Sequence, residues 1–175
     1  MSYDDRILLS SRRQQISRFP GWVLIVVPLA AILSQVYLPL FFQFLGFLEL
    51  PLLVTIYFSL MRGSPVSGIF IGMLVGLAQD SLSKNPLGMF GIVKTLVGYF
   101  AASASSSFDV EHPIIRLLLA FMFFVFHQFC YWTLTRVLLA RELDFEWGRT
   151  FLLASLNAAV GLALFQLLDK LKERS

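Results

Sequence analysis

The sequence predicts an all-α fold, a polytopic transmembrane bundle of six helices. Hydrophobic residues make up 57% of the 175-residue chain and charged residues only 14%, against about 25% charged in a typical soluble domain. Apolar stretches near spanning length recur along the chain, and short breaks separate them. We expect a transmembrane domain over residues 20–169 between two cytoplasmic tails, a basic one at 1–19 and a short one at 170–175.

The first two predicted spans differ in quality. The first, 21–40, is about 20 residues long, which is enough to cross the hydrocarbon core, and no small-residue cleavage site follows it, so we expect it to be retained. The second, 48–61, covers only about 21 Å at 1.5 Å per residue. It either begins earlier, through 44–47, or is a half-helix packed among others. Pro51 suits the first turn of this helix, where a missing N–H costs nothing.

The other predicted spans follow in order. Asp80 closes the third one, and the fifth is long enough to tilt. The four ranges are 67–78, 87–103, 113–139 and 147–168.

Six spans place both chain ends on one side of the membrane. Roughly eight Lys and Arg side chains flank the spans on that side and about three on the other, and cytoplasmic loops carry the excess of positive charge. We therefore expect both termini in the cytoplasm.

Small residues recur at intervals of four on three predicted spans. Such a stripe lies on one helical face, and in hydrocarbon it lets another helix approach closely. The neighbour is either one of this protein's own helices or the single span of a partner. The stripes are Gly68, Gly72 and Gly76 on the third span, Gly98, Ala102 and Ser106 on the fourth, and Ser155, Ala159 and Ala163 on the sixth.

Two opposite charges flank the third and fourth spans. Asp80 ends the third span, and Lys94 lies about 9 Å below the start of the fourth. In an antiparallel hairpin the two side chains approach each other, and a pair lowers the cost of burying the lysine. The alternatives are that Lys94 snorkels to the interface, contacts a partner, or forms a small-molecule or proton site.

The fifth span carries polar and aromatic residues. His127, Tyr131 and Thr135 share a face at intervals of four, where they are expected to hydrogen-bond across helices or, alternatively, to form a functional site. Phe124 belongs to a run of aromatic residues that packs internally, faces lipid, or forms a docking groove for a partner helix.

No catalytic motif is present in the sequence. It lacks a Gly-x-Ser-x-Gly elbow, a His-Glu-x-x-His pair and a phosphate loop. The single cysteine excludes an internal disulfide. The net charge of +3 is mostly terminal, whereas nucleic-acid binding requires basic clusters along a folded face. We therefore expect no enzyme activity, no cofactor, no metal and no nucleic-acid partner.

Five segments occur in a characteristic order: Pro51-Leu-Leu-Val-Thr-Ile-Tyr57, Arg62-Gly63, Gly72-Met-Leu-Val-Gly-Leu-Ala-Gln-Asp80, Pro86-Leu-Gly88 and Lys94-Thr-Leu-Val-Gly-Tyr99. This ordered set resembles the MreD family of bacterial rod shape-determining membrane proteins. It covers about a third of the chain, and Met89 departs from the small residue typical of the family.

The resemblance implies a non-enzymatic subunit of the peptidoglycan elongation machinery in the bacterial inner membrane. Such a subunit binds MreC and, through it, the glycosyltransferase RodA and a class B penicillin-binding protein, and it contacts membrane lipids. The implied fold is similar to the substrate-binding subunits of energy-coupling-factor vitamin transporters.

Two other functions remain open from the residues. The first is a vitamin-type substrate-capture subunit with a pocket near the outer face, roofed by residues 80–86. The second is a membrane enzyme acting on lipid-linked precursors, which the missing catalytic motifs disfavour.

Overall fold

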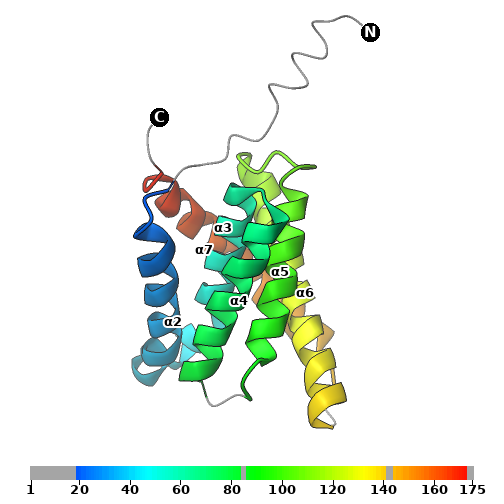
Figure 1. Cartoon of the computed structure of the whole chain (residues 1–175). Helices are drawn as coiled ribbons and strands as arrows, with labels where there is room; N and C mark the ends of the chain where they lie inside the picture. The colour runs from blue at the N-terminus through cyan, green and yellow to red at the C-terminus, as the bar shows by residue number, and fades with distance from the viewer. Residues whose placement is uncertain (1–18, 84–85, 141–143, 173–175) are drawn as a thin grey trace, which may run out of the picture.

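The computed structural model describes residues 19–83, 86–140 and 144–172. Across these ranges the chain forms α-helices and one 3₁₀ helix: α2 Val23–Phe41, η1 Gln43–Phe47, α3 Leu50–Arg62, α4 Pro65–Leu82, α5 Met89–Ala104, α6 Pro113–Leu139 and α7 Trp147–Asp169. The six α-helices run alternately up and down, so that α2 begins and α7 ends at the same end of the bundle (Figure 1). We call this the terminal end and the opposite one the loop end.

The predicted all-α membrane bundle is confirmed. Among the described residues, α2, α4, α6 and α7 are long and apolar enough to cross a membrane, whereas α3 and α5 are apolar but shorter. Asp80 does not end the third helix as predicted, because α4 continues to Leu82. Residues 1–18 and 173–175, which make up most of the predicted tails, lie outside the described residues.

The short second helix is packed among the others. Every side chain of α3 from Pro51 to Met61 is buried, and α3 contacts α2, α4, α5, α6 and α7. A helix that is apolar all round is stable only inside a protein or in lipid. Of the two alternatives for this segment, the structure shows the half-helix, since Gln43–Phe47 forms the separate helix η1. Pro51 lies in the first turn of α3, as predicted.

Asn157 of α7 fixes the junction between η1 and α3. Its Oδ1 accepts the backbone N–H of Glu49 at 2.8 Å, and its Nδ2 donates to the carbonyl of Phe47 at 2.9 Å. Buried helix ends need such partners, because the first N–H groups have none within the helix. The Asn157 side chain is fully buried, so it holds the start of the central helix at a defined depth.

A polar network joins three helices at the terminal end. Arg116 in the first turn of α6 forms an ion pair with Asp169 at the end of α7. Asp169 also accepts the hydroxyl of Tyr57 from α3 at 2.8 Å and pairs with Lys172 at 2.9 Å. Arg116 is almost fully buried, and a buried guanidinium requires this kind of complete pairing. The network ties the end of α7 to the central helix.

Candidate functional site

The glycine stripe of α4 packs against α5. A Cβ atom on Gly68, Gly72 or Gly76 would collide with the backbone carbonyl of Gly98, Lys94 or Phe90, respectively. Gly98 faces back onto Gly68 in the same way. The two helix backbones therefore lie in direct contact, as small residues permit in membranes. Of the two alternatives, this stripe serves the protein's own packing, and it is not available to a partner.

The other two stripes follow the prediction less well. On the fourth span, Ala102 lies close to Gly68, but Ser106 lies beyond the end of α5. On α7 the predicted stripe of small residues was wrong, because it lies on an exposed face. Ser155, Ala159 and Ala163 are exposed, whereas the neighbouring Ala154, Ala158 and Gly161 are buried.

Phe124 is fully buried in the core cluster. It therefore packs internally, and a docking role for this side chain is excluded in the structure described. The exposed apolar residues of α6, including Ile114, Leu118 and Met122, form its outward surface instead.

The carboxylate of Asp80 caps the start of α5. It accepts the backbone N–H groups of Gly88 at 3.0 Å, Phe90 at 3.1 Å and Gly91 at 2.9 Å. A negative charge at a helix N-terminus is favourable because the unpaired N–H groups carry partial positive charge. Gly88 has φ 96°, a left-handed conformation that glycine adopts without strain, and this turn places the three N–H groups around the carboxylate.

Lys94 is buried beside His127, and it forms no ion pair with Asp80. Its Nζ lies 3.4 Å from His127 Nε2 and 4.5 Å from the centre of the Phe90 ring. The predicted interaction between Asp80 and Lys94 is therefore confirmed only as an electrostatic attraction, because backbone N–H groups of α5 bind the carboxylate directly. Snorkelling is excluded, since Lys94 is 0% exposed. The face of the Phe90 ring and the imidazole nitrogen of His127 contact the ammonium, and the carboxylates of Glu49 and Asp80 attract it.

Two residues missed by the sequence reasoning complete this polar centre. Glu49 precedes α3 and interacts with both Gln79 and Lys94. Three side-chain atoms here are buried without a hydrogen-bond partner in the structure: Glu49 Oε2, Gln79 Oε1 and His127 Nδ1. The sequence contained a signal for Glu49, since an acidic residue directly before an apolar helix is unusual in a membrane protein.

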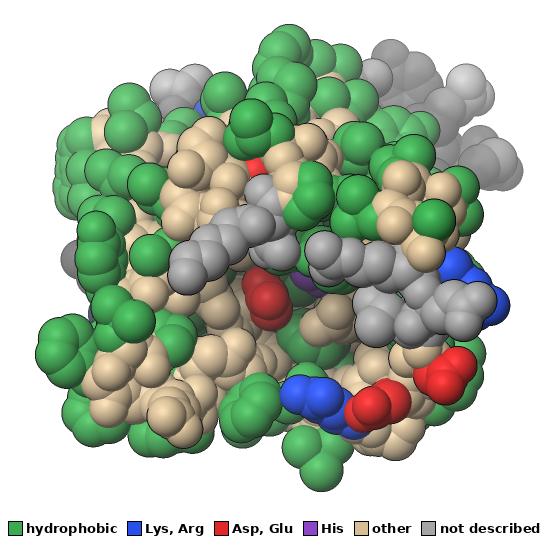
Figure 2. Space-filling view, turned by 90° about the horizontal axis from the view of Figure 1, so that it is seen from below, with side chains coloured by type: hydrophobic (Ala, Val, Ile, Leu, Met, Phe, Trp, Pro, Cys, Tyr) green, Lys and Arg blue, Asp and Glu red, His purple; other side chains and the backbone are tan. Residues whose placement is uncertain are grey.

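The polar centre lies towards the loop end of the bundle. Figure 2 looks onto this end and shows acidic and histidine side chains in a hollow between the helices. Acceptors on Glu49 and Gln79 and donors on Lys94 together suit a small polar group. Within the described ranges no three His, Cys, Asp or Glu side chains are grouped so as to hold a metal ion.

The predicted polar face of α6 is only partly used across helices. His127 reaches Lys94, and Tyr131 stacks on Phe90 with ring centres 5.1 Å apart. Thr135, by contrast, donates to the carbonyl of Tyr131 in its own helix. The hydroxyl therefore forms its hydrogen bond within α6, which is a common arrangement for threonine in a helix.

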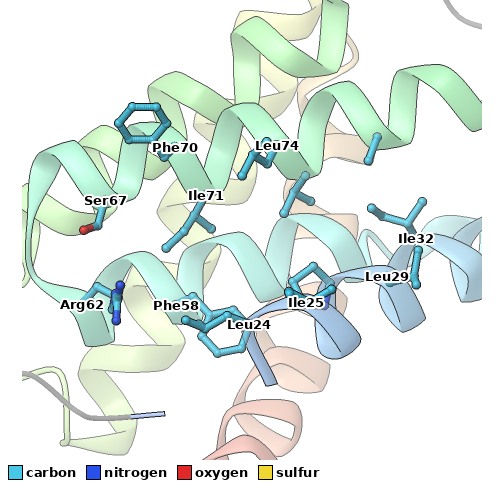
Figure 3. A pocket seen from close by; sticks show the side chains of 13 residues that line it. Leu24, Ile25, Leu29, Ile32, Phe58, Arg62, Ser67, Phe70, Ile71 and Leu74 are labelled. Atoms are coloured by element: carbon cyan, nitrogen blue, oxygen red, sulfur yellow. The ribbon is translucent and has the colours of Figure 1, made fainter. Parts of the chain in front are cut away.

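A second feature lies on the side of the bundle, between α2 and α4. An apolar groove of about 620 Å³ runs between these helices over part of α3. Figure 3 shows Arg62 and Ser67 at one end and Leu29 and Ile32 at the other. No sequence pattern predicts this groove, because it depends on how α2 packs against its neighbours.

The comparisons with known proteins agree with the resemblance of the sequence. The family model described as rod shape-determining protein MreD matches residues 15–171, which is most of the chain. No curated protein and no solved structure matches the chain. The similarity to energy-coupling-factor subunits therefore stays a prediction. With its membrane-spanning helices and this match, the chain belongs to the MreD family of rod shape-determining membrane proteins.

Proposed function

We propose that this protein is a non-enzymatic subunit of the peptidoglycan elongation machinery that binds MreC. The observation that carries the proposal is the family match over residues 15–171. In this proposal the bundle holds the transmembrane helix of MreC. Through MreC it biases RodA and the class B penicillin-binding protein towards activity, and so regulates cell-wall synthesis.

The geometry supports a role in binding. The polar side chains of Asp80, Asn157 and Asp169 hold the helices of the bundle to one another. The α4 stripe is covered by α5, so the MreC helix contacts an outward-facing apolar surface. In lipid such contacts depend on close packing and on interhelical hydrogen bonds.

Copurification tests this proposal directly. The chain is co-expressed with the MreC of the same cell, and either protein is captured by a tag. We expect the other protein to be recovered with the tagged one. An MreC whose transmembrane helix is replaced by an unrelated helix should not be recovered. Recovery of neither protein with the other would contradict the proposal.

Photo-cross-linking maps the surface involved. A photoreactive residue is placed at one outward-facing position on each long helix, Val26, Val66, Met122 or Leu152, all of which are exposed. Buried Phe124 is the matched control. We expect cross-links to MreC from one or two adjacent helices and none from position 124.

We propose that the protein lies in the bacterial inner membrane with both termini in the cytoplasm. Apart from buried Lys94, the described Lys and Arg side chains support this orientation by their places in the fold. Arg62, Arg116, Lys170 and Lys172 lie at the terminal end, against Arg136 and Arg149 at the loop end. The positive-inside rule then assigns the terminal end to the cytoplasm.

A substrate-capture subunit of a vitamin-type transporter is the second candidate. The observation that favours it is the polar centre, with unpartnered atoms on Glu49, Gln79 and His127. A rise in the melting temperature of the purified protein with one member of a vitamin panel, but not with the others, would support it. No shift with any vitamin, together with recovery of MreC, favours the first candidate.

A further inference from the structure

We propose that the groove between α2 and α4 binds an anionic phospholipid, with one acyl chain along the groove and the phosphate on Arg62. This inference rests on the membrane location of the bundle and does not depend on MreC binding.

The groove has the size and the lining that an acyl chain requires. Its volume of about 620 Å³ falls within the range of about 300–1,000 Å³ typical of small-molecule sites. Apolar side chains of three helices form most of its walls, among them Leu24, Phe58 and Ile71. Each CH₂ group moved onto such a surface from water is stabilised, but in a bilayer this gain is absent, so the polar end must provide the selectivity.

Arg62 provides a cation at one end of the groove. It lies in the last turn of α3 and lines the groove together with Ser67 (Figure 3). Its side chain is half-buried and forms no ion pair or hydrogen bond with another described residue. The planar guanidinium matches the oxygens of a phosphate. Helix α3 ends at the terminal end of the bundle. Arg62 therefore lies at the depth of the lipid headgroups.

A transmembrane helix fits this groove less well than a lipid. Helix pairs in membranes approach over small residues, whereas bulky side chains such as Phe58, Ile71 and Leu74 line the groove. The small residues of α4 face α5 instead. A lipid acyl chain is flexible, so it can pack against these bulky side chains without a flat surface.

The test is lipid retention by the full-length protein. The protein is equilibrated in mixed micelles that contain equal amounts of phosphatidylglycerol and phosphatidylcholine, and the bound lipid is measured by native mass spectrometry. We expect selective retention of phosphatidylglycerol, because the ammonium group of phosphatidylcholine offsets the negative charge of its phosphate. Arg62→Gln should weaken this retention about tenfold, since a hydrogen bond to a charged group contributes about that factor.

Matched variants separate the groove from the general surface. Arg149→Gln removes an exposed arginine at the loop end and should leave retention unchanged. Ile71→Trp fills the groove and should lower retention of both lipids, with the melting temperature reporting whether the variant folds. A headgroup without acyl chains, glycerophosphoglycerol, should not compete.

Three results would overturn the proposal. The first is equal retention of the two lipids by the unmodified protein. The second is an equal effect of Arg62→Gln and Arg149→Gln. The third is loss of MreC recovery in Ile71→Trp with lipid retention unchanged, which would assign the groove to the partner helix. Because lipid retention is measured without MreC, failure of the MreC proposal leaves this result intact.

Discussion

At the scale of single residues, the buried polar side chains mainly satisfy the backbone. Asp80 accepts three N–H groups at the start of α5, and Asn157 bonds the backbone on both sides of the η1–α3 junction. In hydrocarbon no water replaces such partners. These residues are therefore expected to be the most sensitive polar positions in the bundle.

Asp80→Asn should destabilise the protein by about 1–3 kcal/mol, because the amide leaves buried N–H groups without an acceptor. Thermal unfolding in detergent measures this cost. Glu146→Gln is the control, since Glu146 is exposed and only weakly paired.

The double variant Asp80→Asn with Lys94→Met tests what Asp80 contributes. Because the carboxylate caps α5 and does not contact Lys94, removing the lysine as well should recover only a small part of the loss. Recovery of most of the stability would show that the two charges act as a pair and would contradict the capping account.

Asn157→Leu should also cost about 1–3 kcal/mol, because Glu49 N–H and Phe47 C=O lose their buried partner. Gln166→Leu is the matched control on the same helix, since Gln166 is exposed. Equal melting temperatures for the two variants would show that the junction does not depend on Asn157.

At the scale of elements, the α4–α5 hairpin is the closest contact in the bundle. Gly72→Leu or Gly76→Leu forces a side chain into the backbone of α5, so we expect a loss of at least about 1–3 kcal/mol, or failure to fold. Gly148→Leu is the control, because nothing lies within 4 Å of that site. Yield and melting temperature measure the effect, and wild-type values for Gly72→Leu would refute the packing described.

The elements were largely predictable from the sequence, and their contacts only in part. The length of the apolar stretches located the six α-helices of the described residues to within a few residues, because this signal is local. The buried stripe on α7 was placed one or two residues away, since small residues occur on both faces of this helix. The partner of Asp80 was missed because backbone N–H groups leave no signature in side-chain spacing. The groove was missed because it depends on tertiary packing.

At the scale of the whole molecule, the orientation in the membrane is open to a direct test. We expect Tyr3→Cys and Phe145→Cys, each in a Cys130→Ser background, to be labelled from opposite sides. A membrane-impermeant thiol reagent added to intact cells should label position 145 and leave position 3 unlabelled until the cells are opened. Labelling of position 3 from outside would reverse the orientation.

The central claim is that this MreD-family bundle acts on cell-wall synthesis by binding and has no turnover of its own. The most direct measurement is glycan polymer formation by purified RodA and its class B penicillin-binding protein in proteoliposomes, with lipid-linked precursor as substrate. We predict that this chain together with MreC raises polymer formation, and that this chain alone leaves the precursor unchanged. Unchanged polymer formation with both proteins present, or consumption of precursor by this chain alone, would contradict the account.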